Sequence, residues 1–243
     1  MLSLFPAAPS ELSYDDLVEL YAYPAELPWL RANFVSSLDG AAQGSDHRSG
    51  TLSNRADRRI FGLLRSLADV IVVGAGTARS EGYLPVTATE TRTSLRNRLG
   101  LAATPSIAVV SRSLRIDAGL LEGGLAPTLV ITTESAPAER RKEVSALAAV
   151  LVAGDTEVDL ALAKELLISR GFPRMLCEGG PALMRDLVSA HAVDELCLTI
   201  APLVLAGDRL RMAQGPLLEP PGQFVLRHLL EDESSLFCRY SRS

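Results

Sequence analysis

Two glycine-containing segments follow apolar runs and could form main-chain pockets for an anion. They are Val72-Val73-Gly74-Ala75-Gly76-Thr77 and Leu176-Cys177-Glu178-Gly179-Gly180-Pro181. Glycine lets the main chain approach a ligand closely, and free amides at the start of a helix favour negative charge. The first segment is not the dinucleotide fingerprint, because Arg79 stands at its third glycine position, and alone it is equally typical of a structural turn. Two such turns in one parallel sheet, however, predict a shared crevice outside the carboxyl ends of the strands.

Charged and hydroxyl side chains near these turns suggest which ligands bind there. Glu178 would repel a phosphate, so we expect it to point toward a substrate; an exposed carboxylate beside a tight turn is the alternative. Arg65 lies near the end of a predicted helix, closest to the crevice, and is the best candidate anion ligand of its helix. Ser111-Arg112-Ser113 directly follows an apolar run and could bind a ribose 2′-phosphate, which would favour NADP over NAD.

Other residues with chemical potential show no catalytic pattern. Ser36-Ser37-Leu38-Asp39-Gly40, taken alone, favours a β-turn in which Asp39 hydrogen-bonds its own backbone. The 3 histidines share no spacing, and the 3 cysteines form no C-x-x-C pair, so we expect no metal site. Widely spaced cysteines are typical of reduced thiols in a cytosolic protein.

The elements that must position these residues alternate between strands and helices. Apolar runs predict strands at residues 30–36, 70–73, 107–110, 128–132, 150–152, 174–177 and 195–200. Helices are predicted at 54–65, 139–147, 159–170 and 181–189, and two antiparallel strands at 224–230 and 235–240. This order predicts an α/β fold with a mainly parallel sheet flanked by helices and an antiparallel C-terminal hairpin. We expect residues 1–28 to be an N-terminal extension, residues 29–243 to be one domain, and residues 83–104 to be a polar excursion that can hold a short helix.

The composition narrows the range of partners. The 243-residue chain is 47% hydrophobic and 22% charged, so a substantial core can form. The net charge of −5 and the lack of a basic stripe argue against nucleic-acid binding. No apolar run approaches the roughly 18 residues of a spanning helix, and the first residues lack the basic start of a signal peptide. We therefore expect a cytoplasmic protein without membrane contact.

The ordered set of motifs resembles the reductase domain of the riboflavin-pathway deaminase-reductases. The resemblance covers about residues 29–240. It rests on the two glycine turns together with Ser36-Ser37-Leu38-Asp39-Gly40, Val193-Asp194-Glu195-Leu196 and Ile200-Ala201-Pro202. It implies a dihydrofolate-reductase-like fold, NADPH as hydride donor and a homodimer. It also implies reduction of the ribose C1′ of 5-amino-6-(5-phosphoribosylamino)uracil to the ribityl product.

The same resemblance assigns roles to individual residues. It implies that NADPH is bound by Val35, Asp39, Gly74, Gly76, Thr77, Ser111, Arg112, Gly179, Gly180, Pro181, Ala182 and Leu183. It places Ser49, Arg65 and Glu178 on the substrate, with Arg65 on its phosphate. Glu178, Glu81 and Asn33 are expected at the reacting atoms.

The chain departs from the family pattern at three positions. Asn33 stands where the bifunctional bacterial enzymes usually carry Lys, and Glu81 stands where they carry Asp. Ala88 falls where a further phosphate-binding Arg of the family would lie, and Arg92 could substitute for it. The zinc deaminase motifs are absent from the sequence, so deamination is not expected.

Three other interpretations stay open at this point. The same site could reduce dihydrofolate or another pterin-like or pyrimidine compound. A nucleotide-binding sensor would bind NADPH tightly without turnover. An α/β protein of another small-molecule pathway would not bind NADPH at all. Titration with NADPH, followed by turnover with each compound, distinguishes them.

Overall fold

The computed structural model describes residues 1–6 and 9–243, and in these residues all strands belong to one 11-stranded sheet. The strands are β1 (Leu2–Phe5), β2 (Ser10–Glu11), β3 (Trp29–Ser36), β4 (Val70–Gly74), β5 (Ser106–Val110), β6 (Thr128–Thr132), β7 (Ala149–Val152), β8 (Arg174–Cys177), β9 (Glu195–Ile200), β10 (Phe224–Asp232) and β11 (Ser235–Arg242). The helices are α1 (Tyr14–Leu20), α2 (Arg55–Leu67), α3 (Ala75–Glu81), α4 (Thr93–Arg98), α5 (Ala118–Leu121), α6 (Ala138–Ser145), α7 (Leu160–Ser169) and α8 (Pro181–Ser189).

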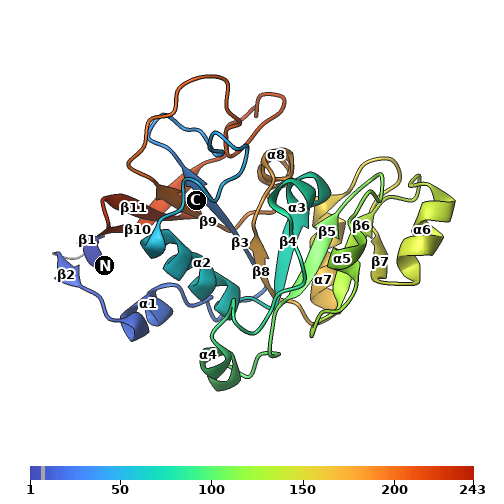
Figure 1. Cartoon of the computed structure of the whole chain (residues 1–243), viewed down its shortest axis with the longest axis horizontal. Helices are drawn as coiled ribbons and strands as arrows, with labels where there is room; N and C mark the ends of the chain where they lie inside the picture. Colours follow the sequence, from blue (N-terminus) through green and yellow to red (C-terminus); the bar gives the residue numbers. More distant parts are fainter. Residues whose placement is uncertain (7–8) are drawn as a thin grey trace.

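The sheet is parallel along most of its width and antiparallel at one end. Its strand order is β2-β1-β10-β11-β9-β3-β8-β4-β5-β6-β7. The strands from β9 to β7 pair in parallel, whereas β11, β10, β1 and β2 pair antiparallel. Figure 1 shows the β10–β11 hairpin at one end of the molecule and α6 beside β7 at the other. The predicted fold class is confirmed.

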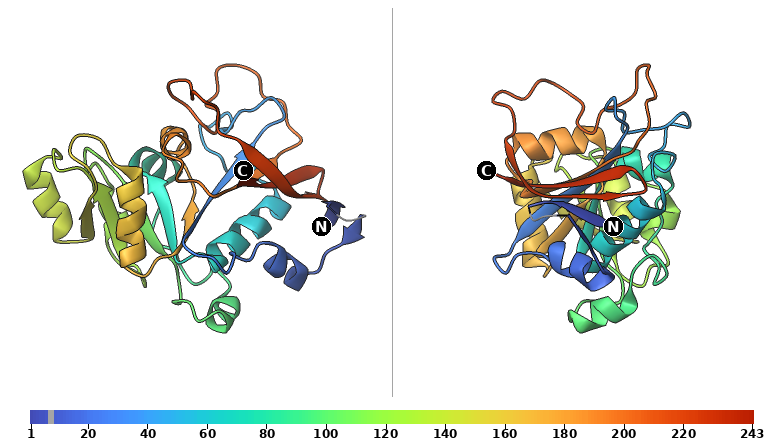
Figure 2. Two further views of the ribbon diagram at one scale, coloured as in Figure 1. Left: turned by 180° about the vertical axis from the view of Figure 1, so that it is seen from behind. Right: turned by 90° about the vertical axis from the view of Figure 1, so that its left-hand side faces the viewer.

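Helices cover both faces of the sheet, so the parallel strands are apolar on both sides. In β4, Ile71 and Val73 pack into the core beneath α1 to α6, while Val70 and Val72 pack into the core beneath α7 and α8. This alternation is the two-residue period of a strand. Seen from behind, α7 lies in front of the parallel strands (Figure 2, left). Burying one such aliphatic side chain stabilises a fold by about 1.5–3 kcal/mol.

The N-terminal segment contributes more to the sheet than the sequence indicated. The strands β1 and β2, which the sequence analysis missed, lie within residues 1–28, and β1 pairs antiparallel with β10. Strands of four and two residues are too short to leave a periodic pattern. The division of the chain after residue 28 stays a prediction.

The polar excursion at 83–104 does hold a short helix, α4, and it is anchored beside α2. The guanidinium of Arg96 is buried and donates to the main-chain carbonyls of Arg65, Ser66 and Ala68 at the end of α2. Those carbonyls have no partner within the helix, so Arg96 completes its C-terminus. The main-chain amide of Arg92 also donates to Ser66 Oγ at 2.9 Å. The excursion is therefore fixed against the helix that carries Arg65.

A buried charged cluster ties β3 to β9 and β11. Glu195 accepts from Arg31 Nε and, at 2.8 Å, from Arg239 Nη2. Burial alone would raise the pKa of Glu195, but the two guanidinium groups outweigh burial and lower it to about 2. Beside the cluster, the ring of His228 lies edge-on to Tyr21 with centroids 4.8 Å apart. Burial, assisted by Arg239, lowers the pKa of His228 from 6.5 to about 3, so this side chain is neutral.

Candidate active site

A cleft with a volume of about 560 Å³ lies at the carboxyl ends of β3, β4 and β8. In Figure 1, α3 and α8 lie together beyond the ends of β4 and β8. The predicted site residues that line the cleft are Asn33, Val35, Ser49, Arg65, Thr77, Glu81, Glu178, Gly180 and Pro181. These residues come from six separate elements or loops, so the fold brings together side chains that are distant in sequence.

The two glycine turns meet, as the sequence predicted. The amide of Gly74 donates to the carbonyl of Gly179 at 2.8 Å. A Cβ atom added to Gly180 would lie 2.1 Å from Thr77 Oγ1, so only glycine leaves room for that hydroxyl. Gly179 has a φ of +97°, a conformation that other residues rarely adopt. Close packing of bare main chain at the starts of α3 and α8 therefore forms one wall of the site.

Arg65 and Glu178 form a two-point ion pair inside this cleft. Arg65 Nε donates to Glu178 Oε1 at 2.8 Å, and Arg65 Nη2 donates to Glu178 Oε2 at 2.7 Å. The Arg65 side chain is only 9% exposed and that of Glu178 only 2%. This planar, parallel geometry is the strongest arrangement of an arginine with a carboxylate. The carboxylate of Glu178, in the turn after β8, is thus held in place by Arg65 of α2.

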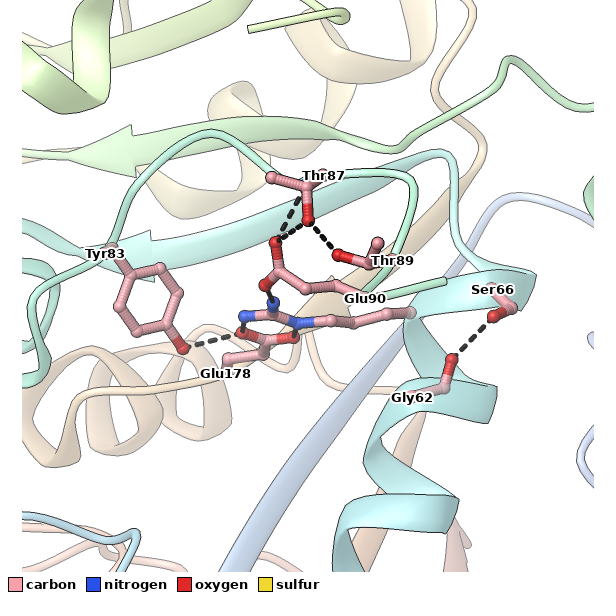
Figure 3. Close-up of polar contacts among 8 residues, drawn as sticks. Gly62, Ser66, Tyr83, Thr87, Thr89, Glu90 and Glu178 are labelled. Atoms are coloured by element: carbon pink, nitrogen blue, oxygen red, sulfur yellow. Dashed lines mark hydrogen bonds and ion pairs between the residues drawn. The ribbon is translucent and has the colours of Figure 1, made fainter. Parts of the chain in front are cut away.

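Three residues of the helix and the excursion complete the surroundings of this pair. Tyr83 donates its hydroxyl to Glu178 Oε2 at 2.6 Å, and the guanidinium of Arg65 lies 4.4 Å from the ring centroid of Phe61. Glu90 Oε1 accepts from Arg65 Nη1 at 2.6 Å. Figure 3 shows Tyr83, Glu178 and Glu90 pointing toward a common centre. Burial opposes the charge of Arg65, but Glu178 outweighs burial and raises its pKa above the usual value. Burial and Glu178 likewise raise the pKa of Tyr83.

The two carboxylates on Arg65 are unequal in strength. Removing one partner of a buried ion pair costs about 3–5 kcal/mol, which applies to Arg65 with Glu178. The pair with Glu90 is only partly buried, because the Glu90 side chain is 42% exposed, and it approaches the weaker class of pairs that reach water, worth about 0.2–1 kcal/mol when both partners are exposed. Glu178 is therefore the more tightly held partner of Arg65, and Glu90 is the more weakly held one.

Glu81 and Ser49 lie together on another wall of the cleft. Glu81 Oε1 accepts from the main-chain amide of Ser49 at 2.8 Å. Both residues line the cleft with Asn33 and Val35 of β3. The hydrogen bond leaves Glu81 Oε2 without a protein partner among the described contacts, so this oxygen is available to a ligand.

Eight of the predicted cofactor ligands do not line the cleft. For three of the eight, the structure gives the side chain or the amide another partner. Asp39 accepts from the hydroxyl of Ser37 and from the amides of Leu205 and Ala206, the latter at 2.7 Å. These hydrogen bonds, led by that from Ser37, lower the pKa of Asp39. Asp39 therefore holds the loop after β9, rather than only its own turn as its motif alone favoured.

The other two lie after β5. Arg112 forms an exposed ion pair with Glu157, and Ser111 is buried with its amide donating to the carbonyl of Ile131. Gly74, Gly76, Gly179, Ala182 and Leu183 belong to the two meeting turns without lining the cleft itself. Whether these residues bind a cofactor stays a prediction.

Several cleft residues were missed by the sequence analysis. They are Phe34, Gln43, Ser53, Asp57, Arg58, Phe61, Ser80, Tyr83, Thr87 and Glu90, besides Gly, Ala, Leu and Pro positions. Tyr83 and Glu90 lie in the excursion, where no periodic pattern marks an inward face. Gly82, with a φ of +75°, ends α3 and turns the chain so that Tyr83 enters the cleft. The only available signal was that glycine followed by an aromatic residue.

The fold and the cleft together define an α/β protein with a small-molecule site at the carboxyl ends of its parallel strands. The chain belongs to the family of the RibD C-terminal domain, whose model matches residues 28–235. This confirms the family that the ordered motifs indicated.

Relatives of known name agree with this membership. The chain is 32% identical over 182 residues to the 2,5-diamino-6-ribosylamino-4(3H)-pyrimidinone 5′-phosphate reductase of Archaeoglobus fulgidus, covering 74% of this chain and 83% of that protein. It is 33% identical over 186 residues to the protein of the same name from Methanothermobacter thermautotrophicus, covering 74% and 80%. Among solved structures, it is similar to a pyrimidine reductase-like protein of Corynebacterium diphtheriae, with a TM-score of 0.79, 29% identity and coverage of 93% and 98%.

The structure also bears on metal and membrane sites. Within residues 1–6 and 9–243, no group of three or more His, Cys, Asp or Glu side chains could hold a metal ion. In the same ranges, none of the helices is both long and apolar enough to cross a bilayer.

Proposed function

We propose that this chain is an NADPH-dependent reductase of riboflavin biosynthesis, acting on a pyrimidine that carries a phosphoribosylamino group. Membership of the RibD C-terminal domain family supports the proposal, as do the names of the archaeal relatives. The observation that carries it is the meeting of two bare glycine turns beside the Arg65–Glu178 pair in one cleft. Such a site offers main chain to a nucleotide and charged side chains to a second ligand.

The start of α8 fits the pyrophosphate of NADPH. Gly180 precedes the helix without any side-chain hydrogen bond to its first amides, and a Cβ atom there would collide with Thr77. Thr77 and residues 179–183 would hold the cofactor, which supplies a hydride when bound. Arg112 would reach a 2′-phosphate only by leaving Glu157, at little cost because both side chains are largely exposed.

The protein's own side chains would orient the substrate and move a proton. Glu178 accepts from Arg65 and Tyr83, so it is held as a hydrogen-bond acceptor for an N–H or O–H of the substrate. Glu81 has one oxygen fixed by the Ser49 amide, and we assign proton delivery to its other oxygen, directly or through water. The neutral amide of Asn33 would lie beside the sugar.

Two ribosyl phosphates are the candidate substrates. The archaeal relatives are named for 2,5-diamino-6-ribosylamino-4(3H)-pyrimidinone 5′-phosphate, and we take this compound as the first candidate. The second is 5-amino-6-(5-phosphoribosylamino)uracil, which the motifs implied and which carries an oxo group in place of the 2-amino group. Both compounds carry the same sugar phosphate, so they differ only in the 2-amino or oxo group on the pyrimidine ring.

The proposal is tested by measuring the oxidation of NADPH through its absorbance, with each substrate in turn. We expect turnover with one or both ribosyl phosphates and none with dihydrofolate. Tight NADPH binding without turnover on any compound would instead identify a sensor. Failure to bind NADPH would reject the whole proposal.

We further propose that the enzyme is a cytoplasmic homodimer. Cys177, Cys197 and Cys238 are free and buried, as suits a reducing compartment. In the loop between β9 and β10, Val204 and Leu217 are largely exposed, and a second subunit would cover such apolar side chains. Sedimentation equilibrium should give twice the mass of the 26.0 kDa chain. A monomer at all concentrations would exclude the dimer.

A further inference from the structure

Arg65 has one binding edge left after it pairs with Glu178. Its Nε and Nη2 atoms donate to the two oxygens of Glu178, which fills one fork of the guanidinium. The other fork consists of Nη1 and the second N–H of Nη2. Glu90 Oε1 accepts from Nη1 at 2.6 Å, so a carboxylate lies on the edge where an incoming anion would bind.

We propose that Glu90 is a specificity-determining residue that occupies the anion-binding edge of Arg65 until the phosphate of the substrate displaces it. The inference deepens the proposed function and rests on it for the identity of the substrate. It makes Glu90 a competitor of the phosphate, so the affinity for phosphorylated ligands depends on how tightly Glu90 is held.

The burial of the partners decides which carboxylate leaves. The Glu178 side chain is 2% exposed and also accepts from Tyr83, so its release would strand a buried charge. The Glu90 side chain is 42% exposed and can turn into water. Its other oxygen accepts from the amide and the hydroxyl of Thr87, at 2.8 and 2.9 Å. These hydrogen bonds hold the Glu90 side chain in one arrangement on Arg65 without burying its carboxylate.

The charges of the cleft favour the same exchange. Its lining contains two guanidinium groups, Arg58 and Arg65, and four carboxylates, Asp57, Glu81, Glu90 and Glu178. A phosphate added to this set would meet an excess of negative charge, and like charges in one site repel strongly. Removal of Glu90 from Arg65 lowers that excess at the point where the phosphate would bind.

Titration of the full chain with inorganic phosphate, without substrate or NADPH, tests the proposal by calorimetry. Glu90→Gln keeps the shape of the side chain and can still accept from Thr87, but it has no charge. We expect it to bind phosphate about five-fold more tightly than the unaltered chain. Glu139→Gln makes the same chemical change at an exposed position of α6, remote from the cleft, and should leave the affinity unchanged.

A kinetic readout separates this role from a merely structural one. The KM of the phosphorylated substrate should fall in Glu90→Gln by a similar factor, while the KM of NADPH stays the same. A residue that only held the excursion in place would instead alter kcat or both KM values. The gain in phosphate affinity should persist in the Arg58→Gln background, because the anion binds Arg65.

Unchanged or weaker phosphate binding by Glu90→Gln would overturn the proposal, as would absence of phosphate binding in every variant. Loss of the gain in the Arg58→Gln background would place the anion on Arg58 and would also overturn it. Because the phosphate titration requires no turnover, a gain without reductase activity would leave this inference standing and reject the proposed function. Normal turnover without a gain would do the reverse.

Discussion

Replacing Arg65 by methionine tests whether the Arg65–Glu178 pair is a structural requirement of the cleft. Methionine keeps an apolar side chain at this position, but it removes all five donors and the guanidinium that lies over the rings of Phe61 and Tyr83. Glu178, with its side chain 2% exposed, would then have only the Tyr83 hydroxyl as a partner. Loss of one member of a buried pair costs about 3–5 kcal/mol. At about 3 °C per kcal/mol for a domain of this size, the melting temperature should fall by roughly 12 °C.

Two further variants isolate the charge from the packing. Arg65→Met combined with Glu178→Gln removes both charges and should recover at least half of the lost stability, because no buried carboxylate remains unpaired. Glu90→Gln removes only an exposed contact of Arg65 and should lower the melting temperature by less than about 3 °C. Urea unfolding at neutral pH, followed by circular dichroism, gives the free energy of unfolding for each variant.

The free energies of unfolding of these variants should follow a definite order. A loss of less than about 1 kcal/mol in Arg65→Met would mean that the pair is no more than a surface contact. A double variant as unstable as Arg65→Met alone would mean that packing, and not the stranded charge, decides the loss. Either result would also remove the reason for which Glu178 is considered fixed while Glu90 exchanges.

Three other predictions concern residues away from this pair. His228 has a folded pKa of about 3, below its unfolded value of 6.5, so below pH 6.5 the unfolded state binds an extra proton. The free energy of unfolding should therefore fall by up to about 1.4 kcal/mol per pH unit as the pH drops from 6.5 toward 5. His228→Phe should flatten this slope in urea titrations. Gly180→Ala places a methyl group 2.1 Å from Thr77 Oγ1 and should weaken NADPH binding about tenfold by fluorescence titration, with partial rescue by Thr77→Ala. Asp39→Ala should speed amide hydrogen exchange at Ala206, and unchanged protection there would contradict the loop clamp.

Features that depend on local sequence were predictable. The run Val70-Ile71-Val72-Val73 is apolar at every position because both faces of β4 are covered, and that pattern is visible in the sequence. The turn at Gly179-Gly180-Pro181 was predictable because proline is favoured in the first turn of a helix, and the two glycines before it mark a turn. The convergence of the two turns followed from the general rule for parallel strands.

Features that depend on distant partners were not predictable. The end of α2 placed Arg65 near the crevice, but the carboxylates that fill its guanidinium lie 113 and 25 residues away. Asp39 likewise takes its main-chain partner Ala206 from 167 residues further along the chain. Periodicity reports which face of an element is buried, and it carries no information on which charged group from another element lies opposite. The ion pair could therefore be found only in the folded structure.

The anchoring of the excursion explains why an exchange at Glu90 would require little rearrangement. Tyr83 is held at one end by a hydrogen bond from its amide to the carbonyl of Ala78, and Arg96 is fixed at the other against the end of α2. The backbone between them carries Glu90 but is bound to the same helix as Arg65, through the amide of Arg92 and Ser66. A ligand that displaced Glu90 would thus rotate one exposed side chain and leave both walls of the cleft in place. A site with so little to reorder retains more of its interaction energy as affinity, and for this reason the charge at position 90, rather than the flexibility of the excursion, should set the preference for a phosphorylated substrate.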